Sequence, residues 1–329
     1  MNIKKVFALA LACAIAIPGL AEQTRAEKLR AKLDSKDRDY VFVTMHRGDW
    51  RHAPENSVDA IKGSIAMGAD IVELDVALTK DGEYVLLHDG ALNRVSNGKG
   101  KSQDLTLAEI KQYRLKDDNG KVTDYEILTL KEALALTKGK ILVNLDKFKR
   151  DPRGIAKYVK KLGMEKEVIL KEVYSPKELK KKMKDEWKSV ENGTFFFMPI
   201  LWLDKGGKAS AKAGISDQET SEASKKSVAS FEEWQAQKRA PGAYELCIPN
   251  EKSVEVLKRL QSMQKNGGPR IWINTLWDNL CAGHTDDRGF KGDPDGSWGW
   301  ALEQGATMIQ TDRPAELIKY LESKGRRNL

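Results

Sequence analysis

The chain has 329 residues, of which 40% are hydrophobic and 32% charged, and its formal net charge is +8. This length allows one large domain or two ordinary ones, and the composition indicates a soluble globular protein with an ample core. The positive charge comes mostly from lysines scattered along predicted helices. Because no arginine-rich run with interleaved aromatic residues is present, the charge argues against a nucleic-acid partner. It fits a solvated basic surface or attraction to phosphate-containing partners.

The N-terminus has the features of a secretory signal peptide. A basic stretch, Met1–Lys5, precedes an apolar run at 6–17, and small residues follow up to Ala21. The apolar run is too short for a transmembrane helix. We therefore predict a signal peptide at residues 1–21 and a periplasmic or secreted mature chain without stable membrane insertion. Cys13 leaves a lipoprotein anchor as the less favoured alternative.

Short apolar runs alternate with amphipathic segments along the mature chain. The strand candidates are residues 41–45, 71–76, 84–87, 140–145, 168–173, 194–201, 243–248, 270–276 and 307–310. The helix candidates are residues 22–39, 56–67, 105–113, 130–137, 155–162, 176–187, 231–237, 253–264, 298–304 and 314–323. This alternation predicts a parallel sheet closed by helices, a single-domain α/β TIM (β/α)₈ barrel over residues 22–329. Nine strand candidates exceed the eight of such a barrel, so we expect one of them to lie outside it.

Two carboxylates stand out in the second strand candidate. Glu73 and Asp75 are two residues apart, so their side chains point to the same face of a strand. Carboxylates held this close repel each other unless a proton or a cation lies between them. Oxygen ligands suit Mg²⁺ or Ca²⁺, and Asp146, at the end of the fourth strand candidate, is the candidate third ligand. Salt-bridged acids without a metal are the alternative.

Two histidines follow strand candidates, His46 after the first and His88 after the third. Histidine gains or loses a proton near neutral pH, so the pair could serve as a general base and a general acid. Arg47 carries an always-charged fork that suits a phosphate oxygen, although an ion pair with Asp75 or Asp146 would also explain it. The sequence does not decide which histidine is the base.

Several of these motifs together resemble the glycerophosphodiester phosphodiesterase family. The motifs, in the family's order and spacing, are His46-Arg47-Gly48, Pro54-Glu55-Asn56-Ser57, Glu73-Leu74-Asp75-Val76, Thr79-Lys80-Asp81-Gly82 and His88-Asp89. The end of the chain, from Gly305-Ala306 to Thr311-Asp312-Arg313-Pro314, also resembles that family's last strand and loop.

The resemblance implies a phospholipase-C-like TIM barrel, a divalent cation, and hydrolysis of glycerophosphodiesters to glycerol 3-phosphate and an alcohol. It also implies that His46 and His88 are the acid/base pair and that Arg47 binds phosphate. In the same way it implies that Glu73 and Asp75 hold the metal.

The fourth strand candidate departs from the family pattern. The family usually has a Glu there and a Lys two residues later, but this chain reads Asn144-Leu145-Asp146-Lys147-Phe148. We carry over Asp146 as a shorter metal ligand and Lys147 as a substrate-binding residue shifted by one position. Lys171, at the end of the next strand candidate, is the alternative cation for the phosphate.

Other positions keep two interpretations. Trp277 follows a strand and either stacks on the substrate or belongs to the core. The long loop 278–300 is either a lid that recognises the alcohol or a plain calcium-stabilised or flexible surface loop. Glu55 either reaches the metal or does not, and either Asn56 or Ser57 is expected to cap the following helix. Cys247 and Cys281 either pair or remain two buried thiols, with the thiols favoured.

Three other functions remain open. A phospholipase C- or D-like lipid phosphodiesterase would need an exposed apolar rim, and the only candidate, Phe195–Phe197, lies in a predicted strand. A phosphomonoesterase could use the same metal centre. A non-catalytic exported binding protein is the alternative of a different class, and the presence of His46, His88 and the carboxylates argues against it. The identity of the metal, the alcohol and the oligomeric state stay open.

Overall fold

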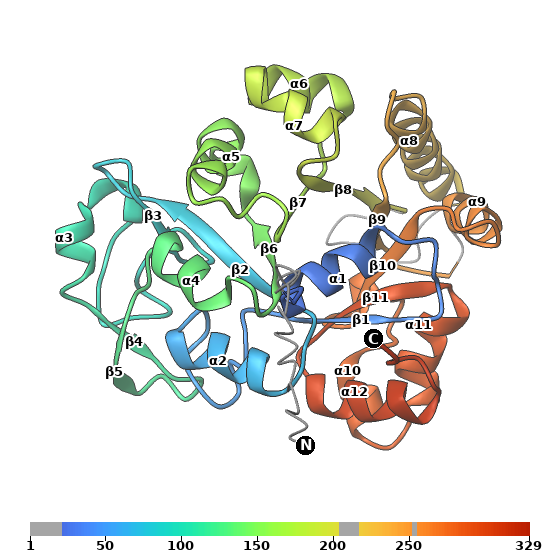
Figure 1. The fold of residues 1–329 in the computed structure, drawn as a ribbon. Helices are drawn as coiled ribbons and strands as arrows, with labels where there is room; N and C mark the ends of the chain where they lie inside the picture. Colours follow the sequence, from blue (N-terminus) through green and yellow to red (C-terminus); the bar gives the residue numbers. More distant parts are fainter. Residues whose placement is uncertain (1–21, 204–216, 252–254) are drawn as a thin grey trace, which may run out of the picture.

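Parallel strands closed into a ring form the centre of the molecule (Figure 1). The computed structural model describes residues 22–203, 217–251 and 255–329, so the predicted signal peptide lies outside the described residues. No helix in this described part is long and apolar enough to span a bilayer.

The described residues form the predicted eight-stranded parallel barrel, because β1 pairs with both β2 and β11 and thereby closes the sheet. Its strands are β1 (Phe42–Met45), β2 (Ile71–Leu78), β6 (Leu142–Asp146), β7 (Val168–Glu172), β8 (Phe196–Trp202), β9 (Ala243–Cys247), β10 (Arg270–Asn274) and β11 (Ala306–Thr311). This confirms the predicted fold class.

Helices cover the outside of the ring (Figure 1). They are α2 (Val58–Ala66), α4 (Leu130–Thr137), α5 (Pro152–Lys161), α6 (Pro176–Met183), α7 (Trp187–Glu191), α8 (Asp217–Gln235), α9 (Glu255–Gln264), α11 (Trp300–Glu303) and α12 (Pro314–Ser323). The predicted helix 176–187 is interrupted, because Lys184 adopts a positive φ of 54° between α6 and α7.

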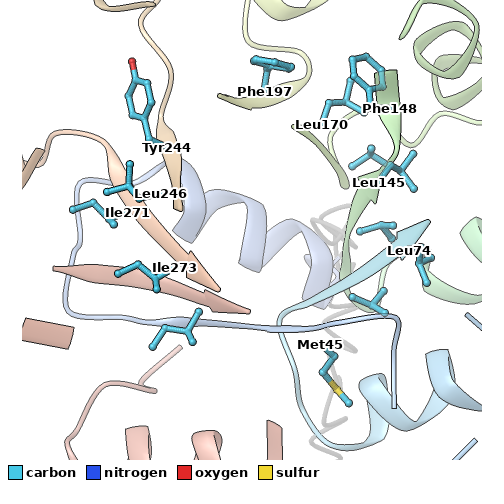
Figure 2. Close-up of a cluster of buried hydrophobic side chains, with 14 of the residues drawn as sticks. Met45, Leu74, Leu145, Phe148, Leu170, Phe197, Tyr244, Leu246, Ile271 and Ile273 are labelled. Carbon is cyan, nitrogen blue, oxygen red and sulfur yellow. The ribbon is translucent and has the colours of Figure 1, made fainter. Parts of the chain in front are cut away.

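Side chains alternate between the two faces of each strand, as the period of two requires. The outward faces pack against the helices, and Figure 2 shows part of this layer, including Leu74, Leu145 and Leu170. The inward faces form a second apolar cluster at one end of the barrel, where α1 (Arg25–Asp34) inserts Leu29 and Leu33. Since α1 and this cluster fill the amino-terminal end, the polar inward side chains gather at the carboxyl ends of the strands.

The strand that lies outside the barrel is β3 (Tyr84–Leu86), which pairs with β2 in the antiparallel direction. His88 therefore follows a strand outside the barrel, and the sequence had not indicated which of the nine candidates this would be. The turn Thr79–Gly82 is too short for the crossover that a parallel neighbour needs. The hairpin nevertheless returns the chain to the mouth, where the Leu87 N–H donates to the Asp75 carbonyl oxygen at 3.0 Å.

A small lobe follows β3 and has its own apolar cluster (Figure 1). It contains α3 (Leu107–Ile110) and the antiparallel hairpin β4 (Arg114–Lys116) and β5 (Val122–Glu126). The predicted helix 105–113 is shorter than expected, and the hairpin replaces a stretch that we interpreted as a polar loop. A turn that contains Gly120, with φ 78°, joins its strands.

Candidate active site

A cavity of about 280 Å³ opens at the carboxyl ends of the barrel strands. Seven of the nine predicted site residues line it: His46, Glu73, His88, Asp146, Lys147, Lys171 and Trp277. The other two, Arg47 and Asp75, do not line the cavity, and Asp75 is fully buried. The barrel therefore brings together residues from across half of the sequence, at the end where TIM barrels place their sites.

The three predicted metal ligands form one cluster. Glu73, Asp75 and Asp146 each offer an oxygen within 4.8 Å of the others, because Asp146 on β6 is the register partner of Asp75 on β2. Burial, followed by the charges of Asp75 and Asp146, raises the pKa of Glu73 well above its usual value. The buried Asp75 Oδ1 has no hydrogen-bond partner. A hard divalent cation would relieve both conditions, so these residues fit one.

Each histidine is held by a carboxylate at Nδ1. His46 Nδ1 lies 2.9 Å from Asp312 Oδ1, and His88 Nδ1 lies 2.6 Å from Asp89 Oδ1. A carboxylate favours the N–H tautomer at Nδ1, which leaves Nε2 of each ring available for proton transfer. Burial lowers the pKa of His88, although Asp75 and Asp89 oppose this. A hydrogen bond from Arg94 lowers the pKa of Asp89 to about 2 and keeps it ionised.

Arg47 occupies a strained turn that aims both its backbone and its side chain at carboxylates. Its φ is 56°, its N–H donates to Glu73 Oε2 at 2.9 Å, and its Nη1 donates to Glu55 Oε2 at 2.9 Å. Its Nε lies 3.6 Å from Asp75 Oδ2, which is one of the two ion pairs we considered. Gly48 is required next, because its φ is 76° and a Cβ there would lie 2.8 Å from the Ala60 backbone.

Glu55 and Asn56 support the site and do not take the roles first considered for them. Arg94 holds both oxygens of Glu55, at 2.7 and 2.8 Å, and Glu55 is not part of the carboxylate cluster. Ser57, and not Asn56, caps α2. The Asn56 side chain instead donates to Asp75 Oδ2 at 3.0 Å and accepts from the Asp75 N–H at 3.1 Å. Both residues therefore fix charged groups of the site.

The two predicted lysines both act on Asp146, since their charges lower its pKa. Lys147 adopts φ 60° and donates to Asp146 Oδ2 at 2.7 Å. Lys171 is buried and forms an ion pair with Glu245 Oε2 at 2.8 Å. Burial opposes the charge of Lys171, but Glu245, Asp146 and Glu73 outweigh it and raise its pKa. Phe148 packs in the outer apolar layer (Figure 2). Lys147 and Lys171 therefore join Arg47 as cations near the cluster.

Trp277 is not a core residue, since its side chain is 51% exposed. Its ring meets the His46 ring edge-on, with centroids 5.5 Å apart. The segment after it folds into short helices, including α10 (Asp286–Phe290) and a π-helical turn, Asp295–Gly299. Cys247 and Cys281 are free buried thiols, as we favoured.

One buried carboxylate organises this segment. Asp286 Oδ1 accepts hydrogen bonds from Thr275, Thr311 and Trp298. Asp286 Oδ2 accepts from the Asp312 N–H at 2.7 Å. Burial raises the pKa of Asp286 to about 6. Asp286 thus fixes the turn that presents Asp312 to His46.

Sequence reasoning missed several supporting residues. They are Arg94, Glu245, Asn274, Asp286 and Asp312. Asp312 was within a quoted motif, but its position before Pro314 indicated only a helix start. The others carried no local signal, because each acts on a residue far away in the sequence.

The fold and the site define a TIM-barrel protein with histidines and clustered carboxylates at the carboxyl ends of its strands. The sequence profile of the glycerophosphoryl diester phosphodiesterase family matches residues 46–190, which carry both histidines and all three clustered carboxylates. Through this region, which is less than half of the chain, the chain is similar to that family. A second profile, described as a domain of unknown function, matches residues 215–321.

Individual proteins are similar to this chain over part of their length. A glycerophosphodiester phosphodiesterase of Caldanaerobacter subterraneus is 37% identical over 151 residues, which cover 43% of this chain and 62% of the relative. Human glycerophosphodiester phosphodiesterase 1 is 40% identical over 106 residues, covering 30% of this chain and 31% of the relative. The matches thus span less than two thirds of the length of these relatives.

Solved structures show the same fold over nearly the whole chain. A glycerophosphoryl diester phosphodiesterase from Parabacteroides distasonis superposes with a TM-score of 0.63 at 23% identity, covering 91% of this chain and 92% of the other. An Oleispira antarctica phosphodiesterase in complex with sn-glycerol-3-phosphate gives 0.55 at 17% identity, covering 86% of this chain and 98% of the other.

Proposed function

We propose that this protein hydrolyses glycerophosphodiesters to glycerol 3-phosphate and an alcohol. The observation that carries the proposal is one cavity in which two carboxylate-supported histidines flank a cluster of three carboxylates. The family match of residues 46–190 and the names of the curated relatives support the same activity. A phosphate diester needs charge stabilisation and two proton transfers, and this arrangement offers both.

The chain's own residues would divide the work as follows. Arg47, with Lys147 or Lys171, binds the phosphate oxygens. One histidine removes the proton from the attacking oxygen, which belongs either to water or to the neighbouring glycerol hydroxyl. The other histidine protonates the alcohol oxygen as its bond to phosphorus breaks.

Glu73, Asp75 and Asp146 would hold Mg²⁺ or Ca²⁺, which supplies polarisation of a phosphoryl oxygen when bound. If the glycerol hydroxyl attacks, the first product is a cyclic phosphate that water then opens. Product analysis before full turnover distinguishes the two routes.

The test is hydrolysis of a panel of glycerophosphodiesters, before and after chelation and with Mg²⁺ or Ca²⁺ restored. We expect activity that chelation abolishes and a metal restores. His46→Ala and His88→Ala should each lower kcat by about 10²- to 10⁴-fold with an unchanged circular dichroism spectrum. His52→Ala is the matched control, because His52 is 77% exposed and pairs with Asp49 outside the cavity. Near-normal rates in either active-site variant, or faster hydrolysis of a monoester, would contradict the proposal.

We also propose that the protein is exported, on the strength of the N-terminal sequence alone. Mass spectrometry of the protein from its native host should find an N-terminus at Glu22. An N-terminus at Met1 would refute export by cleavage, and a lipid on Cys13 would identify an anchor instead.

A further inference from the structure

The mouth of the cavity has an exposed apolar wall. Five large hydrophobic side chains of the described residues are strongly exposed, and two of them, Val173 at 46% and Trp277 at 51%, line this cavity. The other three do not line it. Clustered apolar exposure marks a binding surface, whereas single exposed residues are ordinary.

Four more apolar residues that line the cavity belong to this wall. Ile200 and Trp202 on β8 and Leu276 and Leu280 after β10 also line the cavity. The strand order places β7 to β10 next to one another, whereas the carboxylate cluster comes from β2 and β6. β7 and β9 also contribute Lys171, Glu172 and Glu245 to the lining, but these charged residues are buried, whereas Val173 and Trp277 are exposed at the mouth.

The apolar wall extends to the ring of the proposed catalytic residue His46. Trp277 contacts His46 edge-on at 5.5 Å between ring centroids. A phosphate diester placed between the two histidines would therefore direct one of its two substituents along this wall. Because Val173 and Trp277 are at the solvent edge, a chain on that substituent could extend out of the mouth.

The wall does not suit a cationic head group. Four of its six residues are aliphatic, and an aromatic cage for a quaternary ammonium uses several ring faces. Lys147 and the exposed Lys149 line the same cavity and would repel a positive charge, while the lining acids Glu172 and Glu245 are buried and Glu245 is paired with Lys171.

We infer that the preferred diester carries an uncharged apolar substituent, which binds against Val173 and Trp277. This inference rests on the proposed diesterase function and names its substrate class. The apolar group could come from the alcohol, as an alkyl chain, or from the glycerol, as an acyl chain. Both bury hydrocarbon on the same wall.

The experiment compares soluble glycerophosphodiesters that differ only in this group. One series carries ethanol, butanol or hexanol, one compound carries a butanoyl chain on the glycerol, and the reference is glycerophosphocholine. With Mg²⁺ present, kcat/KM should rise by roughly two- to fourfold per added methylene on the side that meets the wall. Trp277→Ala and Val173→Ser should flatten this rise. Phe290→Ala is the matched control, since Phe290 is also 51% exposed but does not line the cavity.

Binding measured by calorimetry with the metal chelated separates this inference from the proposed function. A flat series in both rate and affinity, or a preference for glycerophosphocholine, overturns the inference and leaves the diesterase activity standing. Affinity that rises with chain length without hydrolysis of any diester overturns the diesterase activity and supports the apolar wall. A rise for only one of the two chain positions identifies which substituent contacts the wall.

Discussion

The two halves of the barrel contribute to the site in different ways. The first half, up to β7, supplies most of the groups that face the cavity with charge or a transferable proton, among them His46 and Lys171. The second half supplies partners for them, since Asp312 holds His46 and Glu245 holds Lys171. Reactive groups and their supports therefore lie far apart in sequence and adjacent in space.

This difference gives the second half a physical role. Residues 215–321, whose matching profile has no assigned function, contain Glu245, Asp286 and Asp312. Each of these buried or half-buried carboxylates fixes a group at the mouth of the barrel. A supporting residue orients a reactive side chain, so its loss should lower the activity without abolishing it.

The largest expected effect on stability comes from breaking the ion pair between Lys171 in the first half and Glu245 in the second half. Lys171→Met leaves Glu245 buried without a cation, which should lower the free energy of unfolding by about 3–5 kcal/mol. Glu245→Gln should cost less, because Lys171 still faces Asp146 and Glu73. Urea unfolding followed by circular dichroism measures both.

The double variant Lys171→Met/Glu245→Gln distinguishes stability from function. It removes both charges, so we expect it to recover most of the stability but not the activity. Equal losses in the two single variants would contradict the asymmetry between the halves. Lys62→Met is a suitable control, since Lys62 is 61% exposed and its partner Asp59 is 47% exposed.

The reactive residues of the first half could be predicted from the sequence because their patterns are local. Glu73 and Asp75 share a face by the period of two, and His46 directly follows a strand. The direction of β3 was also readable, because the turn at Thr79–Gly82 permits only an antiparallel return. We expected one of the nine candidates to lie outside the barrel but did not use this turn to identify β3 as that strand.

The supports could not be predicted in the same way. Lys171 and Glu245 meet only because β7 and β9 lie close in a closed barrel, and the sequence contains no register between them. Arg94 likewise reaches Glu55 and Asp89 from a lobe whose hairpin we did not predict. The sequence shows that an acidic side chain is present, but only the tertiary structure shows which basic side chain it contacts.

The next effect concerns Asp286 and its pH dependence. Burial raises its pKa from 3.8 to about 6, so the folded state holds this proton more tightly than the unfolded state. The resulting stabilisation is complete below pH 3.8 and is lost as the pH rises through about 6, a change of up to about 3 kcal/mol. Asp286→Asn cannot titrate. The unfolding free energy of the wild type minus that of this variant should therefore fall between pH 4 and 7, and a constant difference would refute the buried ionisation.

The smallest effect compares the two histidine supports directly. Asp312→Asn and Asp89→Asn each weaken the hydrogen bond that orients a catalytic imidazole, which should lower kcat by about 10- to 100-fold with little change in KM. Asp312 is the less exposed, at 14% against 36%, so water can replace its contact less well and its loss should be the larger. Asp185→Asn is the control, because Asp185 pairs with Arg153 away from the cavity. Asp89→Asn could instead lower kcat more than Asp312→Asn does. In that case the hydrogen bonds of Arg94 to Asp89 and Glu55, and that of Arg47 to Glu55, would couple His88 to Arg47. The first half would then supply supporting residues as well as reactive ones.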